Sequence, residues 1–252
     1  MEEIKAYYFS PIDGRTAKLI AYAASFGIDE WTYSKKETRF CTRKLKEFTA
    51  VSVREDSGVE LCKRHLNHTA EHVLDPTILL SPADYRKLIG EEGAEKYTNK
   101  ITAFILDRSE DKLAALEKVS KVLAMDYNFA ATETEDRLTP LEKRIAPSVA
   151  DWLKAMYYAD FIFTDSFHGC VFSILFNKPF VLYVNRNRGV ARFDSLLKLF
   201  KIENRTLSDS NELESCRIRQ SIDWKPINAK LEEMRSKSMR FLENALTAKD
   251  EQ

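Results

Sequence analysis

Short apolar runs alternate along this chain with longer stretches in which apolar residues recur every three or four positions. Short runs bounded by polar residues or glycine are typical of buried strands, and the longer spacing indicates amphipathic helices. The pattern predicts strands at 19–25, 50–53, 71–74, 101–106, 161–164 and 180–184. It predicts helices at 58–65 (capped by Ser57), 79–89, 112–123, 149–157, 170–176, 193–200 and 228–246. Strands that alternate with helices favour an α/β fold with parallel sheets.

A polar, glycine-bearing stretch at 90–99 separates two such series and predicts a linker. Each series is expected to form a Rossmann-like unit with a parallel sheet. The first has few strands and no glycine-rich turn between strand and helix. We therefore expect it to be incomplete, with an open sheet edge that favours a homodimer. The predicted division is 1–92 for the incomplete N-terminal α/β unit, 93–222 for a C-terminal Rossmann-like domain and 223–252 for a C-terminal helix.

Composition and charge narrow the class of protein. Of 252 residues, 31% are charged and 44% hydrophobic, which is typical of a soluble globular enzyme. Lysine plus arginine equals aspartate plus glutamate at 39 each, so no net field attracts nucleic acid or an anionic membrane. No apolar run approaches the roughly 20 residues that span a bilayer, and the first residues lack the form of a signal peptide. The four cysteines have no CxxC spacing, which predicts free thiols and a cytoplasmic location.

The candidate chemistry lies in the stretch ADFIFTDSFHG at 159–169. A short apolar strand ends there at a polar turn, and His168 and Gly169 then open a helix. Ligands of α/β proteins bind at the carboxyl end of a strand that faces a helix N-terminus, and anions bind the amides of such a terminus. The other three histidines crowd one polar region, at His65, His68 and His72. His168 is therefore the histidine that we expect to take part in chemistry.

A second block, RNRGVARFDSLL at 186–197, follows this motif. Together with ADFIFTDSFHGCVFSILFNKPFV it resembles the polysaccharide pyruvyl transferase family. The resemblance continues upstream in FTAVSVREDSGVELC, VLDPTILL and AYAASFG, in the family's order, and covers most of 19–205. It implies two Rossmann-type domains facing a cleft, the GT-B arrangement, with 93–222 binding the donor. Relatives carry a further segment before AYAASFG, which implies that the acceptor side is reduced here.

The resemblance also implies the reaction, in which the pyruvyl group of phosphoenolpyruvate is transferred to a sugar as a ketal. The partners are then phosphoenolpyruvate and a sugar or lipid-linked oligosaccharide. No metal or further cofactor is expected. The protein would work in the cytoplasm, with the inner membrane face as a possible peripheral location. Two other functions stay open: a GT-B-type glycosyltransferase using a nucleotide sugar, with Glu203 as a weak candidate for holding a ribose, and a truncated, non-catalytic anion-binding paralogue.

Phosphoenolpyruvate carries a phosphate and a carboxylate, so its site needs several cationic or N–H donors. His168 is expected either to bind these anions or to act as the general acid that protonates the methylene carbon. Asp165 would orient the imidazole or accept a proton from a sugar hydroxyl. The amides around Ser166 and the close backbone approach that Gly169 allows would hold an anion. The remaining predicted ligands are Arg54, Arg188 and Arg192, as bidentate clamps, and Ser25, as part of the cleft lining.

Each assignment has a structural alternative. Asp165 and Ser166 would serve equally as helix caps. Arg192 would pair with Asp194 or Glu203, and Arg54 would be held by Glu55 or Asp56. Arg186 competes with Arg188 in the same loop, and Ser25 would form a tight turn with Gly27.

Overall fold

The computed structural model describes residues 18–131, 139–141, 144–184 and 189–248. These residues form two units, each an α/β structure with a parallel sheet, which confirms the predicted fold class. Unit 1 combines described residues of Met1–Leu79, Arg188–Leu199 and Ala229–Gln252, and unit 2 those of Leu80–Asn187 and Phe200–Asn228. Both units are discontinuous along the chain. They differ in this respect from the continuous ranges 1–92, 93–222 and 223–252 that the sequence suggests.

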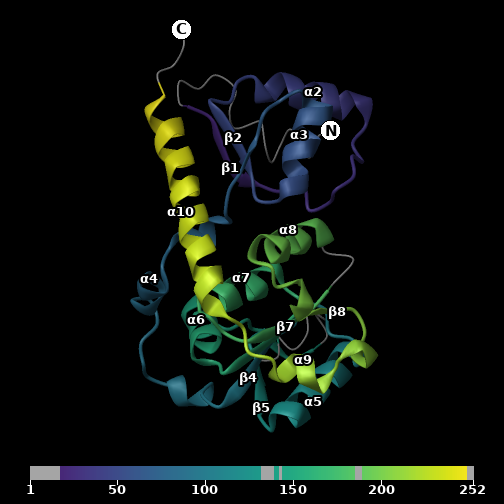
Figure 1. Cartoon of the computed structure of the whole chain (residues 1–252), viewed down its shortest axis with the longest axis vertical. Helices are drawn as coiled ribbons and strands as arrows, with labels where there is room; N and C mark the ends of the chain where they lie inside the picture. The colour runs from purple at the N-terminus through teal and green to yellow at the C-terminus, as the bar shows by residue number, and fades with distance from the viewer. Residues whose placement is uncertain (1–17, 132–138, 142–143, 185–188, 249–252) are drawn as a thin grey trace. The chain divides into compact units, whose positions relative to one another are not determined.

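Unit 1 has a sheet of three parallel strands among its described residues, in the order β1-β2-β3. They are β1 (Ile20–Ala24), β2 (Ala50–Val53) and β3 (Glu71–His72). Helix α2 (Lys35–Leu45) connects the first two strands and α3 (Asp56–Leu66) the next two (Figure 1). The predicted strands are confirmed, the third in shortened form. Helix α2 was not predicted, although its capping box of Ser34 and Glu37 is the S-x-x-E signal of a helix start.

Successive residues of β2 point to opposite faces of this sheet, and each face is covered. Val51 and Val53 pack with Leu66 of α3 on one side. On the other side Ala50 packs in a cluster around Phe241 of α10 (Trp224–Thr247). Helix α10 begins four residues before the predicted 228. Its Pro226 lies in the first turn, where the missing amide hydrogen has no intrahelical acceptor.

Two further features of unit 1 differ from the predictions. Helix α3 begins at Asp56, so the predicted cap Ser57 lies inside the first turn and Glu55 occupies the N-cap position. Helix α8 (Val190–Phe200) packs on this same end of α3. The Asp56 amide donates to Ser195 Oγ at 3.0 Å, and Lys198 forms an ion pair with Asp56 at 3.6 Å.

Unit 2 has five parallel strands among its described residues, in the order β5-β4-β6-β7-β8. This is a doubly wound sheet, and the strand order reverses between β4 and β6, where ligands of such folds bind. The strands are β4 (Lys100–Phe104), β5 (Asp126–Phe129), β6 (Phe161–Thr164), β7 (Phe180–Tyr183) and β8 (Thr206–Leu207). The predicted β4, β6 and β7 are confirmed, whereas β5 and β8 were not predicted.

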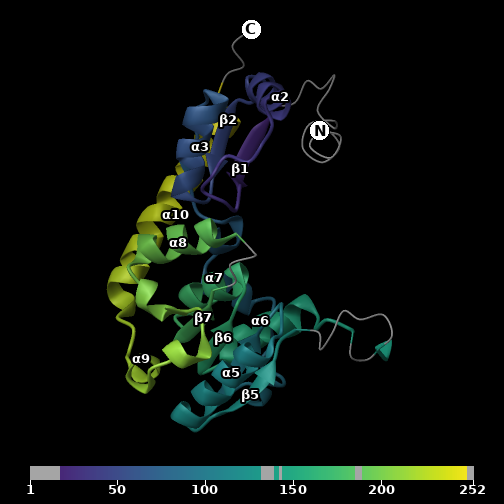
Figure 2. The same ribbon diagram turned by 90° about the vertical axis from the view of Figure 1, so that its right-hand side faces the viewer.

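Helices cover both faces of this sheet (Figure 2). Helices α5 (Glu110–Leu123) and α9 (Ser215–Arg219) share one core with Ile101 and Phe163. Helices α6 (Val149–Tyr158) and α7 (Phe167–Leu175) contact each other and lie on the opposite face. There Thr102 Oγ1 of β4 donates to the Ala155 carbonyl of α6 at 2.9 Å. The predicted helices at 112–123, 149–157 and 170–176 are confirmed with small shifts of their ends.

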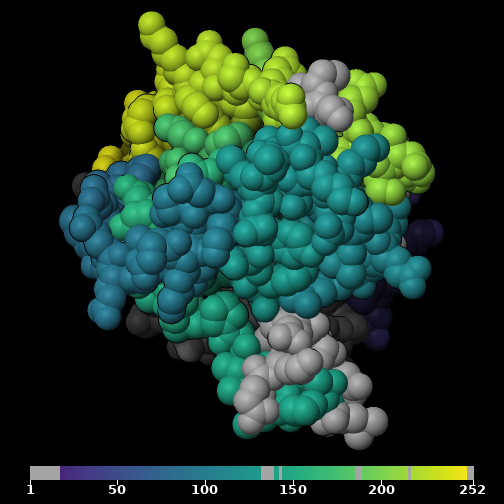
Figure 3. All heavy atoms as spheres, turned by 90° about the horizontal axis from the view of Figure 1, so that it is seen from below, coloured from purple at the N-terminus to yellow at the C-terminus, as the bar shows by residue number. Residues whose placement is uncertain are grey.

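The range 79–99 has a shorter helix than the predicted 79–89 and a helical turn within the predicted linker at 90–99. It contains the short helices α4 (Pro82–Arg86) and η4 (Ala94–Lys96), preceded by η3 (Pro76–Leu79) in unit 1. Lys154 Nζ of α6 donates to the Glu92 carbonyl at 2.6 Å, and Asn128 Nδ2 donates to the Lys96 carbonyl at 2.6 Å. Figure 3 shows this segment, in blue, lying against the teal residues of unit 2. It is therefore part of unit 2.

No helix within the described residues is both long enough and apolar enough to cross a bilayer.

Candidate functional site

The predicted site residues fall into two groups, one in each unit. The first group is the turn Thr164–Gly169 of unit 2, which lies at the point where the strand order reverses. The second group is Ser25, Arg54 and Arg192, which all belong to unit 1. The sequence placed Arg192 on the same wall as the TDSFHG motif, but α8 carries it into the other unit. Arg188 and its competitor Arg186 lie outside the described residues.

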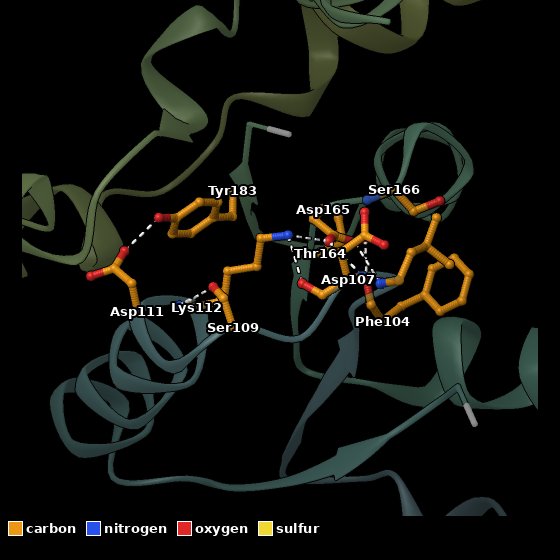
Figure 4. A network of polar contacts seen from close by, with 10 residues as sticks. Phe104, Asp107, Ser109, Asp111, Lys112, Thr164, Asp165, Ser166 and Tyr183 are labelled. Atoms are coloured by element: carbon orange, nitrogen blue, oxygen red, sulfur yellow. Dashed lines mark hydrogen bonds and ion pairs between the residues drawn. The ribbon is translucent and has the colours of Figure 1, made fainter. Parts of the chain in front are cut away.

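The turn of unit 2 ties the carboxyl ends of β4 and β6 together (Figure 4). Thr164 Oγ1 donates to the Phe104 carbonyl at 2.7 Å and accepts from the Ser166 amide at 3.0 Å. Helix α7 then begins at Phe167. Ser166 occupies the N-cap position and is buried, but its side chain forms no capping hydrogen bond. Ser166 therefore stands at the N-cap position, as the capping alternative predicts, but its side chain does not cap the helix.

Asp165 anchors this turn. It is fully buried, and its carboxylate accepts from the Leu106 amide at 2.7 Å and the Asp107 amide at 3.1 Å. Lys112 Nζ of α5 forms an ion pair with it at 2.7 Å and also donates to the Asp107 carbonyl at 2.7 Å. These contacts fix the turn that leads from β4 into α5. They favour a structural role for Asp165 over the base or imidazole-orienting role expected from the sequence.

A second polar group lies beside this ion pair. Tyr183 Oη and the Ser210 amide and hydroxyl donate to the Asp111 carboxylate, and these bonds lower the pKa of Asp111. Burial and the bond to Asp111 raise the pKa of Tyr183. The Lys112 ammonium lies 5.6 Å from the centre of the Tyr183 ring. Tyr183 and Asp111 thus form a hydrogen-bonded pair beside the ion pair of Lys112 and Asp165.

His168 differs from the rest of the motif because it is exposed, whereas Thr164–Phe167 and Gly169 are buried. It is the second residue of α7, and its ring meets that of Phe167 edge-on with centres 5.6 Å apart. A ligand that approaches the N-terminal turn of α7 from solvent therefore meets His168 and the backbone amides of that turn. The amides favour an anion there.

Gly169 has a structural reason for lacking a side chain. A Cβ at this position would lie 2.1 Å from Thr164 Oγ1 and 2.8 Å from Thr164 Cβ. Helix α7 packs directly on the last residue of β6, and only glycine allows that approach. A close approach to the Gly169 backbone is therefore present, as predicted, but the approaching group is the Thr164 side chain.

We expect Gly169→Ala to lower the free energy of unfolding by about 1–3 kcal/mol, because the added methyl group overpacks a buried contact. Urea unfolding followed by circular dichroism measures this change. Gly90→Ala is the matched control, since a Cβ there would meet nothing closer than the Glu92 amide at 4.0 Å. The control is expected to stay within about 0.5 kcal/mol of the parent protein. Equal stability of the two variants would contradict the packing role of Gly169.

In unit 1, Arg54 forms an ion pair with the buried Asp75, rather than with Glu55 or Asp56. Asp75 also accepts from the amide and hydroxyl of Thr77, at 3.1 and 2.7 Å. Burial alone would raise the pKa of Asp75, but the bonds from Thr77 and Arg54 outweigh burial and hold it below its usual value. Asp75 therefore stays ionised and fixes the Arg54 side chain just after β2.

Glu55 shapes the neighbouring turn after β1. Its side chain is fully buried, and Oε1 accepts from the Phe26 amide at 2.5 Å and the Gly27 amide at 3.1 Å. Gly27 has a φ of +73°, which favours glycine. Ser25 is exposed at the start of this turn. The predicted tight turn is thus present, and Ser25 is at its accessible end.

Arg192 lies against the same turn. A Cβ on Gly189 would come within 2.8 Å of Arg192 Nη2 and 2.9 Å of the Gly27 carbonyl oxygen, so the side chain fits against a glycine pair. Burial lowers the pKa of Arg192, and the nearby Arg54 cation lowers it further, against the opposing effects of Glu55 and Asp75. Arg54 also lies beside this turn, since its amide donates to the Ala24 carbonyl at 3.1 Å.

The alternative pairing of Arg192 with Asp194 is not favoured. Burial raises the pKa of Asp194, and the carboxylates of Asp29 and Asp56 raise it further. A carboxylate paired with an arginine would show the opposite shift. A pair of arginines is instead a common arrangement for binding phosphate or carboxylate, because each guanidinium offers five N–H donors.

The sequence missed the partners that build both groups. Lys112 was predicted only as the first residue of the helix at 112–123, and Asp75 was not among the predicted site residues. Nothing local marks either as an ion-pair partner, because the paired residues are far apart along the chain. Among the described residues, no three His, Cys, Asp or Glu side chains are arranged to hold a metal ion.

Known proteins were compared with this chain at three levels: individual curated proteins, solved structures and a family model. No individual curated protein matches the chain. Solved structures of the wall teichoic acid polymerase TagF are similar at a TM-score of 0.40, with 11% identity over 88% of this chain and 60% of that chain. A TagF variant soaked with CDPG is similar at a TM-score of 0.39, with 12% identity over 88% of this chain and 59% of that chain. The chain thus spans about three fifths of the length of these structures. The family model for polysaccharide pyruvyl transferase matches residues 6–187, more than half of the sequence, and the protein therefore belongs to this family.

Proposed function

We propose that this protein transfers the pyruvyl group of phosphoenolpyruvate to a sugar of a polysaccharide, with formation of a ketal. Family membership supports a transferase that modifies a polysaccharide. The observation that carries the finer proposal is the placing of two arginines at one turn: Arg192 lies against Gly27, and Arg54 follows β2 with its amide bonded to the Ala24 carbonyl. Phosphoenolpyruvate has two anionic groups on a small carbon frame, and such a pair suits one of them.

In this proposal Arg54 and Arg192 bind an anionic group of the donor through parallel N–H···O bonds. Asp75 and Glu55 preorganise the site. Asp75 fixes the Arg54 side chain, and Glu55 fixes the turn against which Arg192 lies. Ser25 offers a hydroxyl at the open side of that turn. An anion between two like charges also relieves their mutual repulsion, which is part of the binding free energy.

His168 is the proposed general acid. Protonation of the methylene carbon of phosphoenolpyruvate leaves C2 electron-poor, and a sugar hydroxyl adds there. Phosphate then leaves with the C2–O bond electrons, and a second hydroxyl closes the ketal. The two hydroxyl protons go to the imidazole and to phosphate, so the histidine is restored. The amides of the first turn of α7 would stabilise anionic charge beside it, by about 0.3–2 kcal/mol.

We expect Arg192→Lys to weaken phosphoenolpyruvate binding by roughly 10- to 100-fold, because lysine keeps the charge but lacks the planar fork. Isothermal titration calorimetry with phosphoenolpyruvate measures the affinity. Arg240→Lys is the matched control, since Arg240 is an exposed arginine of the same unit on α10. Equal affinity of the two variants would remove Arg192 from the donor site.

Measurements of ligand binding and of phosphate release separate the competing functions. Thermal stabilisation of the protein by a nucleotide sugar, with no binding of phosphoenolpyruvate, would favour the glycosyltransferase alternative. Binding of phosphoenolpyruvate without phosphate release, in the presence of a range of sugar acceptors, would favour the non-catalytic paralogue. Phosphate release that depends on both phosphoenolpyruvate and a sugar supports the proposal.

A further inference from the structure

A pocket of about 290 Å³ lies on unit 1, next to Phe26 of the Gly27 turn, whose ring centre lies 5.9 Å from that of Trp31. It opens where the segment before α2 and the first turns of α2 meet the end of α3. Its lining residues are Trp31, Tyr33, Lys35, Thr38, Arg39 and His65. None of them takes part in the arginine pair or in the turn of unit 2. Its volume is near the lower end of small-ligand sites, which are roughly 300–1,000 Å³.

Aromatic rings in fixed positions form the floor of this pocket. The Trp31 indole and the His65 imidazole stack in parallel, with centres 4.8 Å apart and planes inclined by 4°. The Tyr33 ring lies 4.9 Å from Trp31 at 60°. Trp31 Nε1 donates to Thr38 Oγ1 at 3.0 Å, so the indole cannot turn. Tyr33 and His65 are exposed. Rings that are already ordered lose little conformational freedom when a ligand packs on them.

Positive charge lines the rim. Lys35 and Arg39 are four residues apart on α2 and therefore share one side of the helix. Neither forms an ion pair with any residue that the structure describes. The neighbouring Glu37 carboxylate accepts from the amide and hydroxyl of Ser34, at 3.0 and 2.7 Å, as part of the capping box. The described residues that line the pocket include no acidic side chain. Lys35 and Arg39 therefore favour an anion at this rim.

We propose that this pocket binds an acidic glycan, a chain of sugars that carries carboxylates. The C–H groups on one face of a pyranose ring are weakly positive and suit the negative faces of indole and phenol rings. Lys35 and Arg39 would bind the carboxylate of that sugar or of the next. The choice of a glycan over other anions rests on the proposed function, because a polysaccharide-modifying enzyme meets such chains.

A single-stranded nucleic acid also has stacking faces and negative charge, but the pocket fits it less well. Proteins that bind it carry a continuous basic groove along the backbone. This chain has equal numbers of acidic and basic residues, 39 each, and Lys35 and Arg39 are the two lysine or arginine side chains among the described residues that line the pocket. Two cations suit one or two carboxylates on adjacent sugars.

The test is a titration of the full chain with tetragalacturonate, followed by calorimetry and by tryptophan fluorescence, since Trp31 is one of three tryptophans. Neutral maltotetraose and a four-nucleotide DNA serve as comparison ligands. We expect saturable binding of tetragalacturonate and at least tenfold weaker binding of both others. Arg39→Gln and Tyr33→Ala should each weaken binding roughly tenfold, as the loss of a hydrogen bond to a charged group or of a stacking face predicts. Lys36→Gln, on α2 but outside the pocket, should bind as the parent does.

The proposal is overturned if tetragalacturonate does not bind, if the DNA binds as tightly, or if Arg39→Gln and Lys36→Gln bind alike. Thermal unfolding of each variant shows whether it is folded. Arg39 is exposed, so Arg39→Gln should leave stability unchanged, whereas Tyr33→Ala should lower the melting temperature slightly through the lost ring contacts with Trp31 and Phe26. Phosphoenolpyruvate titration keeps the two proposals separate. Arg39→Gln should retain donor binding, and Arg192→Lys should retain glycan binding.

Discussion

Asp165→Ala is expected to lower the free energy of unfolding by about 3–5 kcal/mol, one of the largest single-residue effects in this protein. The change leaves the Lys112 ammonium buried without its carboxylate and removes the acceptor of two amides. A buried charge without a partner costs far more than the pair itself contributes. Urea unfolding followed by circular dichroism gives the difference.

The double variant Asp165→Ala with Lys112→Met tests the cause of this loss. Because it removes both charges, it should be more stable than Asp165→Ala alone. The surface pair of Lys230 and Glu233, at 2.8 Å, is the matched control, and Glu233→Ala should cost under about 1 kcal/mol. A double variant no more stable than Asp165→Ala would show that the amide contacts, and not the buried charge, dominate.

His168→Ala is expected to lower the rate of phosphate release by roughly 10²- to 10⁴-fold, the usual contribution of a general acid. His168 is exposed, so stability should change by no more than about 0.5 kcal/mol. The measurement is phosphate release from phosphoenolpyruvate with a sugar acceptor at saturating donor. Unchanged release would end the catalytic assignment of His168.

His168→Gln distinguishes the two roles considered for this residue. Glutamine keeps a hydrogen-bond donor but cannot transfer a proton at neutral pH. If His168 is the acid, both variants should lose turnover equally while phosphoenolpyruvate affinity stays close to that of the parent. If it only binds the donor anion, His168→Gln should retain most of the turnover.

Strands with a clear apolar run were predictable from the sequence. Ala50–Val53 and Phe161–Thr164 match their predicted bounds, because each is a short apolar run closed by polar residues. Strand β5 was missed because Asp126–Phe129 is an edge strand with polar side chains and no apolar run. Helix α2 was missed because few of its residues are apolar, and only the capping box marks it.

The candidate site was predictable in its residue types but not in its pairing. The motif at 164–169 and the arginines were found by their positions after strands and by the family resemblance. The partners Asp75 and Lys112 could not be found in the same way, since only the folded chain brings them to Arg54 and Asp165. Neither could the sequence show that Arg192 joins Arg54 in unit 1. The homodimer, the cytoplasmic location and the absence of a cofactor stay predictions.

The last long helix has a consequence for synthesis of the chain. Helix α10 covers one face of the sheet of unit 1 through Phe241, and Ser238 Oγ accepts from the Leu74 amide at 3.0 Å. A ribosome delivers the strands of unit 1 before unit 2, and these residues of α10 after it. Ala23 and Val73 therefore stay uncovered by Phe241 until the whole of unit 2 has been synthesised. During that interval the nascent sheet is open to chaperones and to aggregation.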